Sequence, residues 1–142
     1  HQMHMSMSHR ENEAGLDVRN RHGVGAIAFS PLAQGILTGK YINGIPADSR
    51  AAGASVFLNA NHVTGSVEVI TKRLMEISDG RGQSLAQMAL AWVLQKKGMT
   101  SVIIGASRTE QIVENLKTME NMAFTEEELR RIDEILYDET EV

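Results

Sequence analysis

Hydrogen-bond donors follow a short apolar run of the sequence at residues 23–31. Ser30 stands at the end of this run, Thr38 and Lys40 follow among closely spaced glycines, and Arg50 comes ten residues later. Hydroxyl, ammonium and guanidinium groups on a glycine-rich loop suit a pyrophosphate. The spacing therefore predicts an anion-binding loop after a buried strand.

A second apolar run, residues 100–107, also ends in residues suited to an anion. Gly105 and Ser107 are followed directly by Arg108. We expect Ser107 and Glu110 to form a capping box that opens a helix, whose free N–H groups would face outward beside the arginine. Two such sites at the ends of two strands indicate one ligand with two phosphate centres. Taken singly, surface charges and an ordinary helix cap are the commoner roles of these residues, so the prediction rests on their combination.

Two common nucleotide-binding motifs do not fit. A P-loop needs two glycines five residues apart and a hydroxyl after its lysine, whereas Gly35 and Gly39 are four apart and Tyr41 follows Lys40. A dinucleotide-binding fingerprint needs its glycines after a strand, and here the Gly23–Gly25 pair precedes one. Both nucleotide-triphosphatase and Rossmann interpretations are therefore disfavoured.

The elements that must position these residues alternate between strands and helices. The sequence predicts a strand at 24–29, a long loop from about 32 to 60, two amphipathic helices, a strand within 100–107 and two further helices. This order predicts parallel pairing in an α/β fold. Residues 1–22 show no sustained period and are expected to be poorly ordered or a strand remnant. The helical stripes run along Val67–Ile77, Leu85–Val93, Ile112–Met119 and Leu129–Leu136.

Composition narrows the class of protein. The chain has 142 residues, 42% of them hydrophobic, no cysteine and a formal net charge of −4. There is no basic block for nucleic acid, no thiolate metal site, and no apolar segment that would export or anchor the chain. The terminal histidines His1 and His4 lack further ligands, so no metal site is expected. We expect a cytoplasmic globular domain without nucleic-acid or membrane partners.

Taken together, these stretches resemble the aldo-keto reductase superfamily. FSPLAQGILTGKY at 29–41, Ser49-Arg50 and IIGASRTEQIVEN at 103–115 resemble the cofactor-binding signatures of the branch that holds bacterial L-glyceraldehyde 3-phosphate reductases and potassium channel β subunits. The resemblance covers 23–137, and His1-Gln2 looks like the end of the sixth barrel strand. It implies the C-terminal portion of a (β/α)₈ TIM barrel, with strands seven and eight and their helices. Residues 23–142 would form its cofactor-binding part.

The resemblance implies NADPH as cofactor and assigns contacts to each part of it. The resemblance places Ser30, Leu32, Gln34, Thr38 and Lys40 around the pyrophosphate, and Arg50 along the adenosine. It places Gly105, Ser107 and Arg108 around the 2′-phosphate, and Gln111, Glu114 and Asn115 at the adenine and its ribose. Gln2 would lie against the nicotinamide carboxamide.

Catalysis in this superfamily uses an Asp, Tyr, Lys and His tetrad from the first half of the barrel, and none of those motifs is present here. Tyr41 and Tyr137 lie in the cofactor loop and the last helix, and Met5 replaces a usual aromatic residue. We therefore expect no catalytic residue and no carbonyl reduction by the isolated chain. The alternatives are a non-catalytic NADPH-binding regulatory module and a truncated relic.

An incomplete barrel has a further consequence. A closed barrel needs eight strands and about 250 residues, so a chain with two clear strands leaves a sheet edge and barrel-facing side chains exposed. The resemblance thus favours self-association or pairing with an N-terminal half. The carbonyl substrate would bind only in the completed barrel.

Overall fold

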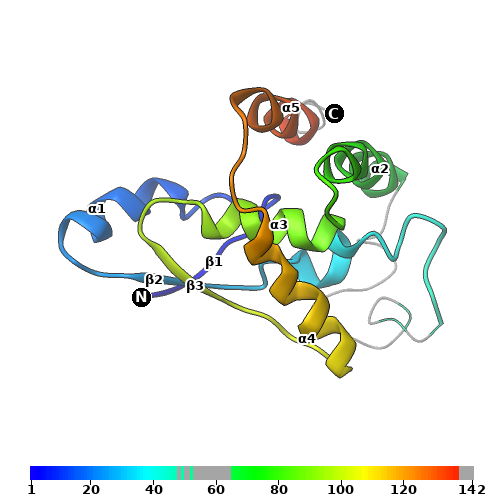
Figure 1. Ribbon diagram of the computed structural model, residues 1–142, viewed down its shortest axis with the longest axis horizontal. Helices are drawn as coiled ribbons and strands as arrows, with labels where there is room; N and C mark the ends of the chain where they lie inside the picture. Colours follow the sequence, from blue (N-terminus) through cyan, green and yellow to red (C-terminus); the bar gives the residue numbers. More distant parts are fainter. Residues whose placement is uncertain (48, 50–51, 53–64, 138–142) are drawn as a thin grey trace. The chain divides into compact units, whose positions relative to one another are not determined.

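The computed structural model describes residues 1–47, 49, 52 and 65–137 (Figure 1). Arg50 and most of the second half of the expected loop lie outside the described residues. Among these residues, no helix is long and apolar enough to cross a membrane. The elements are β1 (Gln2–His4), η1 (Glu13–Gly15), α1 (Leu16–Arg21), β2 (Ala26–Phe29), η2 (Ala33–Thr38), α2 (Gly65–Gly80), α3 (Leu85–Leu94), β3 (Met99–Ile103), α4 (Thr109–Leu116), η5 (Lys117–Glu120) and α5 (Glu126–Tyr137).

The chain divides into two compact units. The first unit contains residues 1–33 and 86–123, and therefore all three strands together with α1, most of α3, and α4. The second unit contains residues 34–85 and 124–142, with η2, α2 and α5.

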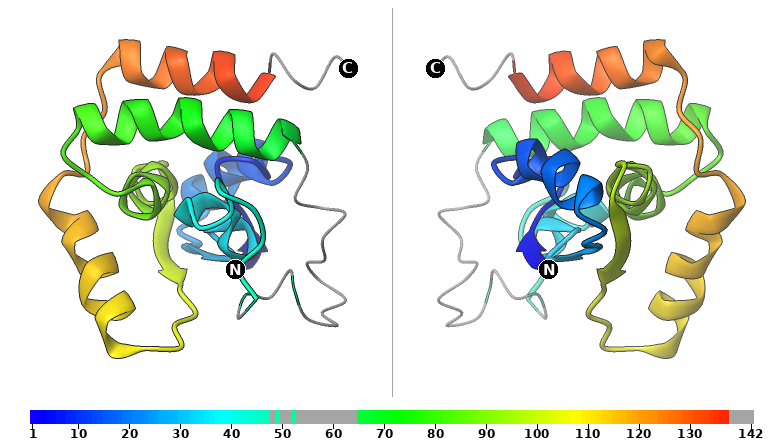
Figure 2. Two further views of the ribbon diagram at one scale, coloured as in Figure 1. Left: turned by 90° about the vertical axis from the view of Figure 1, so that its right-hand side faces the viewer. Right: turned by 90° about the vertical axis from the view of Figure 1, so that its left-hand side faces the viewer.

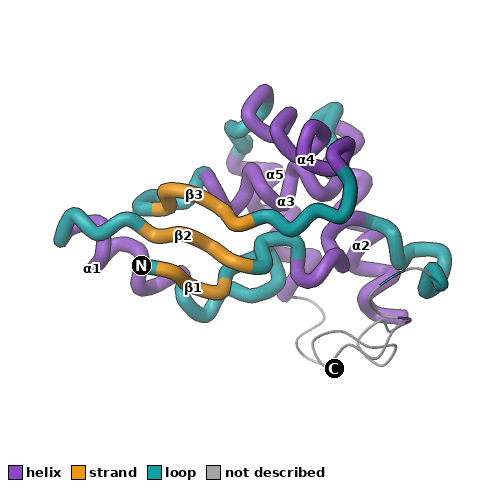
Figure 3. Tube along the Cα trace, turned by 90° about the horizontal axis from the view of Figure 1, so that it is seen from below, coloured by secondary structure: helices purple, strands orange, loops and turns teal. Residues whose placement is uncertain are grey.

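The first unit is built on a parallel three-stranded sheet in the order β1-β2-β3 (Figure 3). Phe29 at the end of β2 pairs with His4 of β1 on one side and Ile103 of β3 on the other. Parallel strands need crossover connections, which α1 and the long segment up to α3 provide. The predicted parallel α/β arrangement is confirmed.

The two faces of this sheet differ in burial. Met3, Ala26 and Ala28 are buried, and α1 and α3 lie on one side of the sheet (Figures 1 and 3). Side chains on the opposite face are open, with Phe29 37% and Ile103 46% exposed. Because side chains alternate along a strand, one face has a core and the other presents apolar residues to solvent. No described element of the first unit covers that second face.

Residues 1–22 contain more structure than their pattern indicated. Besides β1 and α1, a tight turn brings the backbone of Ser6 and His9 together in an antiparallel bridge. Met3, Met5 and Met7 are all buried. Their alternate spacing is itself a strand signal. The strand remnant expected near His1-Gln2 is therefore present as β1, and the residues after it are ordered as well.

The second unit packs α2 against α5, which lie side by side in Figure 2. Leu74 and Ile77 of α2 and Ile132 and Ile135 of α5 are buried, as their helical spacing predicts. The capping box that opens α5 is also confirmed. Its Glu128 backbone N–H donates to the Thr125 hydroxyl over 3.1 Å, and the Thr125 N–H donates to the Glu128 carboxylate over 2.7 Å.

The apolar stripe of α4 is exposed, contrary to the prediction that it forms an inner face. Ile112, Leu116 and Met119 are 44%, 63% and 65% exposed. The helix follows β3, an edge strand of the described sheet, so no further strand and helix of the described first unit lie beyond it. A periodic stripe identifies an apolar face without identifying what covers it.

Candidate functional site

The carboxyl ends of the three strands lie at one edge of the sheet in the first unit. This follows from parallel pairing and from the register that places Phe29 between His4 and Ile103. Ser30 comes directly after β2, and Gly105 comes two residues after β3. A ligand held by the segments after β2 and after β3 requires two neighbouring strand ends that point the same way, and β2 and β3 meet this requirement.

The loop after β2 has an unusual backbone. Ser30, Ala33 and Gln34 have φ angles of 54°, 48° and 59°, and they are the non-glycine residues with positive φ within the described part of the chain. Residues other than glycine avoid positive φ, and residues with such backbone strain cluster at binding sites. The Ala33 N–H donates to the Ser30 carbonyl over 3.0 Å and closes the turn. This strain is a site signal that the sequence did not reveal.

Lys40, in the second unit, folds back over its own loop. Its Nζ lies 5.0 Å from the centre of the Tyr41 ring. Gly35 has a φ of 98°, and a Cβ added there would lie 3.1 Å from the Lys40 Nζ, so this loop requires glycine. The Thr38 hydroxyl donates to the Gly35 carbonyl over 2.7 Å. The ammonium group therefore lies above a glycine turn, and the Thr38 hydroxyl in that turn is already hydrogen-bonded.

The start of α4 differs in detail from the predicted cap. The helix begins at Thr109, and Arg108 is its N-cap with extended φ and ψ of −144° and 148°. The Gln111 side-chain carbonyl accepts from the Ser107 N–H over 2.8 Å and from the Arg108 N–H over 3.3 Å. The predicted pairing of Ser107 with Glu110 was wrong, because an amide at Gln111 reaches the same free N–H groups. Ser107 and Arg108 are exposed beside them.

The far end of α4 is fastened to α3 within the first unit. The buried Gln87 amide donates to the Glu114 carboxylate over 2.6 Å and to the Glu114 carbonyl over 2.9 Å. Lys117 bonds the same carboxylate over 3.0 Å, and this hydrogen bond raises the pKa of Lys117. Asn115, the next predicted contact, is half-buried. The carboxylate of Glu114 is thus held in place before any ligand arrives.

Gln2 lies on the open face of the sheet, in register with Ile27. It is two residues before the end of β1, so it precedes the strand end rather than following it. His4 and Phe29 share this face, and their rings stack with centres 5.1 Å apart. Neither residue is among the predicted site residues. Alternation from Gln2 along the strand would have pointed to His4.

The predicted site residues are distributed over both units. The second unit contains Gln34, Thr38 and Lys40, and Arg50 lies outside the described residues. The first unit contains the larger set: Gln2, Ser30, Leu32, Gly105, Ser107, Arg108, Gln111, Glu114 and Asn115. Of these, Ser30 and Gly105 follow the carboxyl ends of β2 and β3.

Comparison with known proteins decides the family. Residues 1–137 match the sequence profile of the Aldo/keto reductase family. The chain belongs to this family. It is similar to an L-glyceraldehyde 3-phosphate reductase of Escherichia coli, at 47% identity over an alignment of 131 residues that covers 87% of this chain. It is also similar to a Schizosaccharomyces pombe protein named as a voltage-gated potassium channel β subunit, at 38% identity over 94% of this chain.

Two solved structures align with most of this chain. A thermostable aldo-keto reductase crystallised with the inhibitor epalrestat aligns with a TM-score of 0.61 and 26% identity over 94% of this chain. The glycerol dehydrogenase of Gluconobacter oxydans aligns with a TM-score of 0.74 over 96% of this chain, and at 22% identity it supports the fold alone. The chain spans 36% of the E. coli reductase and 40% of the S. pombe protein.

Proposed function

We propose that this chain is the C-terminal, NADPH-binding part of an aldo-keto reductase barrel. In this proposal β2 and β3 are the seventh and eighth strands, and β1 is the end of the sixth. The observation that carries it is the pairing of β2 with β3 in parallel, which brings Ser30 and the segment from Gly105 to Arg108 to one edge of the sheet. Parallel barrels bind their ligands at this edge.

The residues present fit a nicotinamide dinucleotide in charge and hydrogen-bonding capacity. Ser107 and Arg108 are exposed donors at a helix N-terminus, which suits the 2′-phosphate that distinguishes NADPH from NADH. The strained turn beginning at Ser30 suits a phosphate group of the dinucleotide. In the second unit, taken by itself, the Lys40 ammonium above a glycine turn is a charged donor of the kind that binds phosphate. Gln2 offers an amide to the nicotinamide carboxamide. When bound, the cofactor supplies a hydride; the residues of this chain hold and orient it.

We propose that the reaction of the completed protein is reduction of small aldehydes or ketones of the glyceraldehyde 3-phosphate type. The similarity to the E. coli reductase supports this substrate class. The Asp, Tyr, Lys and His tetrad that the resemblance requires has no counterpart in these 142 residues. The chain alone therefore binds the cofactor without reducing a carbonyl. Pairing with an N-terminal half would cover the open sheet face around Phe29 and Ile103.

A second function has support in the similarity to the channel β subunit, which extends over 94% of this chain. In that case the chain serves as a non-catalytic NADPH-binding regulatory module. Addition of a polypeptide containing the first six strands separates the two proposals. Carbonyl-dependent NADPH oxidation by the mixture supports the reductase, and unchanged binding without oxidation supports the regulatory module.

Fluorescence titration with NADPH tests the binding site itself. We expect Lys40→Ala to weaken binding by about tenfold, since a charged hydrogen bond contributes ~1.5–3 kcal/mol, and to reduce its salt dependence. Lys72→Ala is a matched control in the same unit, because Lys72 pairs with Glu68 on the surface of α2 over 2.6 Å. Failure of the chain to bind NADPH, or equal effects of the two variants, would contradict the proposed site.

A further inference from the structure

Three aromatic rings stack at the carboxyl end of β1 in the first unit. The His4 ring lies between the rings of His9 and Phe29, with centres 3.8 Å and 5.1 Å away. The planes differ by 25° and 12°, so the three rings are close to parallel. Because His4 and Phe29 are paired in the sheet and both lie on its open face, the stack forms part of that face.

Backbone contacts fix the outer ring of this stack. Ser6 and His9 exchange two backbone hydrogen bonds, of 3.1 Å and 3.2 Å, which fold the chain back over β1. The Asn12 side-chain amide donates to the His4 carbonyl over 2.9 Å, and the His9 ring lies 3.4 Å from the Glu11 carboxylate. The arrangement is therefore held by the turn rather than by the two imidazoles alone.

The stack favours a neutral ring at its centre. The titratable groups that face His4 are His9 and Glu11, both on the segment that folds back, and its neighbour on β2 is the uncharged Phe29. Burial lowers the pKa of His4, the nearby His9 lowers it further, and Glu11 opposes them. At neutral pH His4 is accordingly uncharged, and acidification adds a positive charge to the open face of the sheet.

We infer that His4 makes this chain's preference between the reduced and the oxidised dinucleotide depend on pH. The inference rests on the proposed function, which places the nicotinamide against Gln2. His4 is two residues from Gln2 on the same strand face, a separation of about 7 Å. The oxidised nicotinamide ring is a cation and the reduced ring is neutral. A protonated His4 therefore repels the oxidised form alone.

The size of this discrimination follows from Coulomb's law. We take the spacing of His4 and Gln2, about 7 Å, as the distance between a charge on His4 and one on a ring held against Gln2. At that distance, in a watery to moderately polar environment, two unit charges change an affinity by roughly 3- to 10-fold. The effect has to be measured as the ratio of the two dissociation constants, because the 2′-phosphate also titrates near pH 6 and changes each constant by itself. That phosphate is present in both redox forms, so its titration cancels from the ratio.

The experiment measures dissociation constants of NADPH and NADP⁺ between pH 5.5 and 8. For the natural chain we expect the ratio of the NADP⁺ constant to the NADPH constant to rise roughly 3- to 10-fold as pH falls. In His4→Gln and His4→Asn the ratio should stay flat. His22→Gln is the control, since His22 is an exposed histidine at the end of α1, and it should retain the pH dependence.

A second measurement follows the imidazole protons of the chain without nucleotide by NMR. His9→Gln should raise the pKa of His4, which would support the coupling that the stack implies. A ratio that stays flat in the natural chain, or that rises equally in the His4 variants, would overturn the inference while leaving NADPH binding intact. Binding of neither nucleotide would overturn the proposed function, and this inference with it.

Discussion

Arg81, directly after α2, provides a sharp test of how the second unit is held together. Its side chain is only 2% exposed and bonds the Glu128 carboxylate over 2.8 Å. Its guanidinium carbon lies 3.8 Å from the centre of the Phe124 ring, and its Nε donates to Gln83 over 2.9 Å. Arg81→Met keeps much of the length of the side chain and removes all of these polar contacts.

The magnitude can be worked from the surroundings of Glu128. Removing one partner of a fully buried ion pair costs ~3–5 kcal/mol. Glu128 is 24% exposed and keeps the Thr125 N–H at 2.7 Å, so its carboxylate retains some water and one donor. Loss of the contact with Phe124 adds part of the ~0.5–2 kcal/mol of a cation–π interaction. We expect a net loss of about 2–3 kcal/mol, just below the range for a fully buried pair, because Glu128 is partly exposed.

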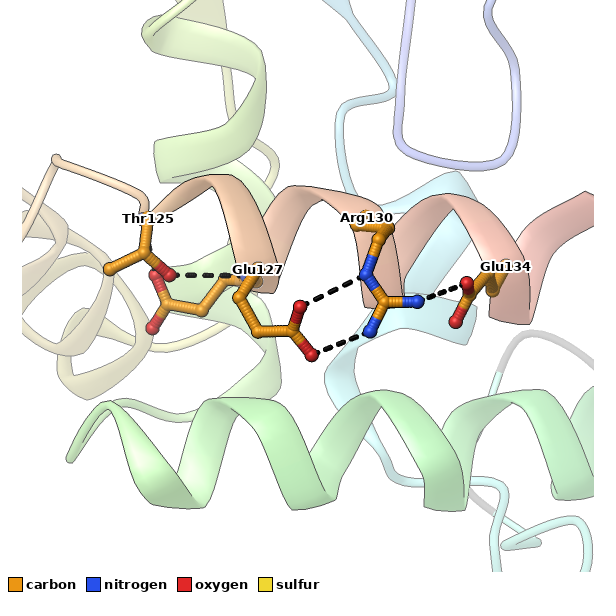
Figure 4. A network of polar contacts seen from close by, with 5 residues as sticks. Thr125, Glu127, Arg130 and Glu134 are labelled. Carbon is orange, nitrogen blue, oxygen red and sulfur yellow. Dashed lines mark hydrogen bonds and ion pairs between the residues drawn. The ribbon is translucent and has the colours of Figure 1, made fainter.

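Arg130 on α5 offers a matched control (Figure 4). It bonds Glu127 over 2.6 Å and also contacts Glu134, with its side chain 56% exposed. Exposed pairs of this kind contribute little because water screens them. Arg130→Met removes the same charge from the same pair of helices at a site that water reaches. We expect no measurable change in its unfolding midpoint.

Urea unfolding followed by circular dichroism, together with thermal melts, measures both variants. For a domain of this size a loss of about 2–3 kcal/mol corresponds to a decrease in Tm of roughly 5–10 °C. The decrease for Arg81→Met should persist in 0.5 M salt, since its charge is buried. Equal midpoints for the two variants would refute the argument that burial decides the value of the pair.

Three further predictions concern the first unit, with Gly44 in the second unit as a control. The pKa of His4 lies below its ordinary 6.5, so near that pH the folded chain binds fewer protons than the unfolded chain. The unfolding free energy should therefore fall as pH drops through 6.5. Thermal melts from pH 5 to 8 measure this fall, and the same pH slope in His4→Gln would contradict the assignment to His4. Gly98→Ala should lower the unfolding free energy more than Gly44→Ala. Both glycines have positive φ, but of the two only Gly98 would bring a Cβ against another residue, Asn20, at 3.1 Å. Equal urea midpoints for the two variants would contradict this steric argument. Gln111→Ala should lower the unfolding free energy by ~1 kcal/mol through loss of a helix cap. An unchanged urea midpoint would show that the hydrogen bonds from the Ser107 and Arg108 N–H groups to Gln111 contribute nothing to stability.

Local signals in the sequence predicted several elements well. The stripe of α2 and the capping box at Thr125 and Glu128 involve residues three or four apart, so they need no knowledge of the rest of the chain. Parallel pairing of β2 and β3 followed from the alternation of apolar runs and helices. β1 is three residues long, too short for a period to stand out, and only the resemblance of His1-Gln2 to a strand end pointed to it.

Other features depend on contacts that no local pattern encodes. Ser107 and Gln111 both follow rules for helix caps, and only the backbone at Arg108 decides that Gln111 reaches the free N–H groups. Ala33 and Gln34 have no preference for positive φ, so the strain after β2 arises from the surrounding structure. The exposure of Leu116 likewise depends on what packs beside α4.

The candidate contacts share a property that bears on how a ligand would bind. The N–H groups of Ser107 and Arg108 already donate to the neutral carbonyl of Gln111, and in the second unit the Lys40 ammonium lies over the ring of Tyr41. An anion must replace these partners. Hydrogen bonds to a charged acceptor are about twice as strong as those to a neutral one, so the exchange is favourable for phosphate and unfavourable for a neutral ligand. At the proposed site, these internal partners would hold the donors in position and at the same time select for charge.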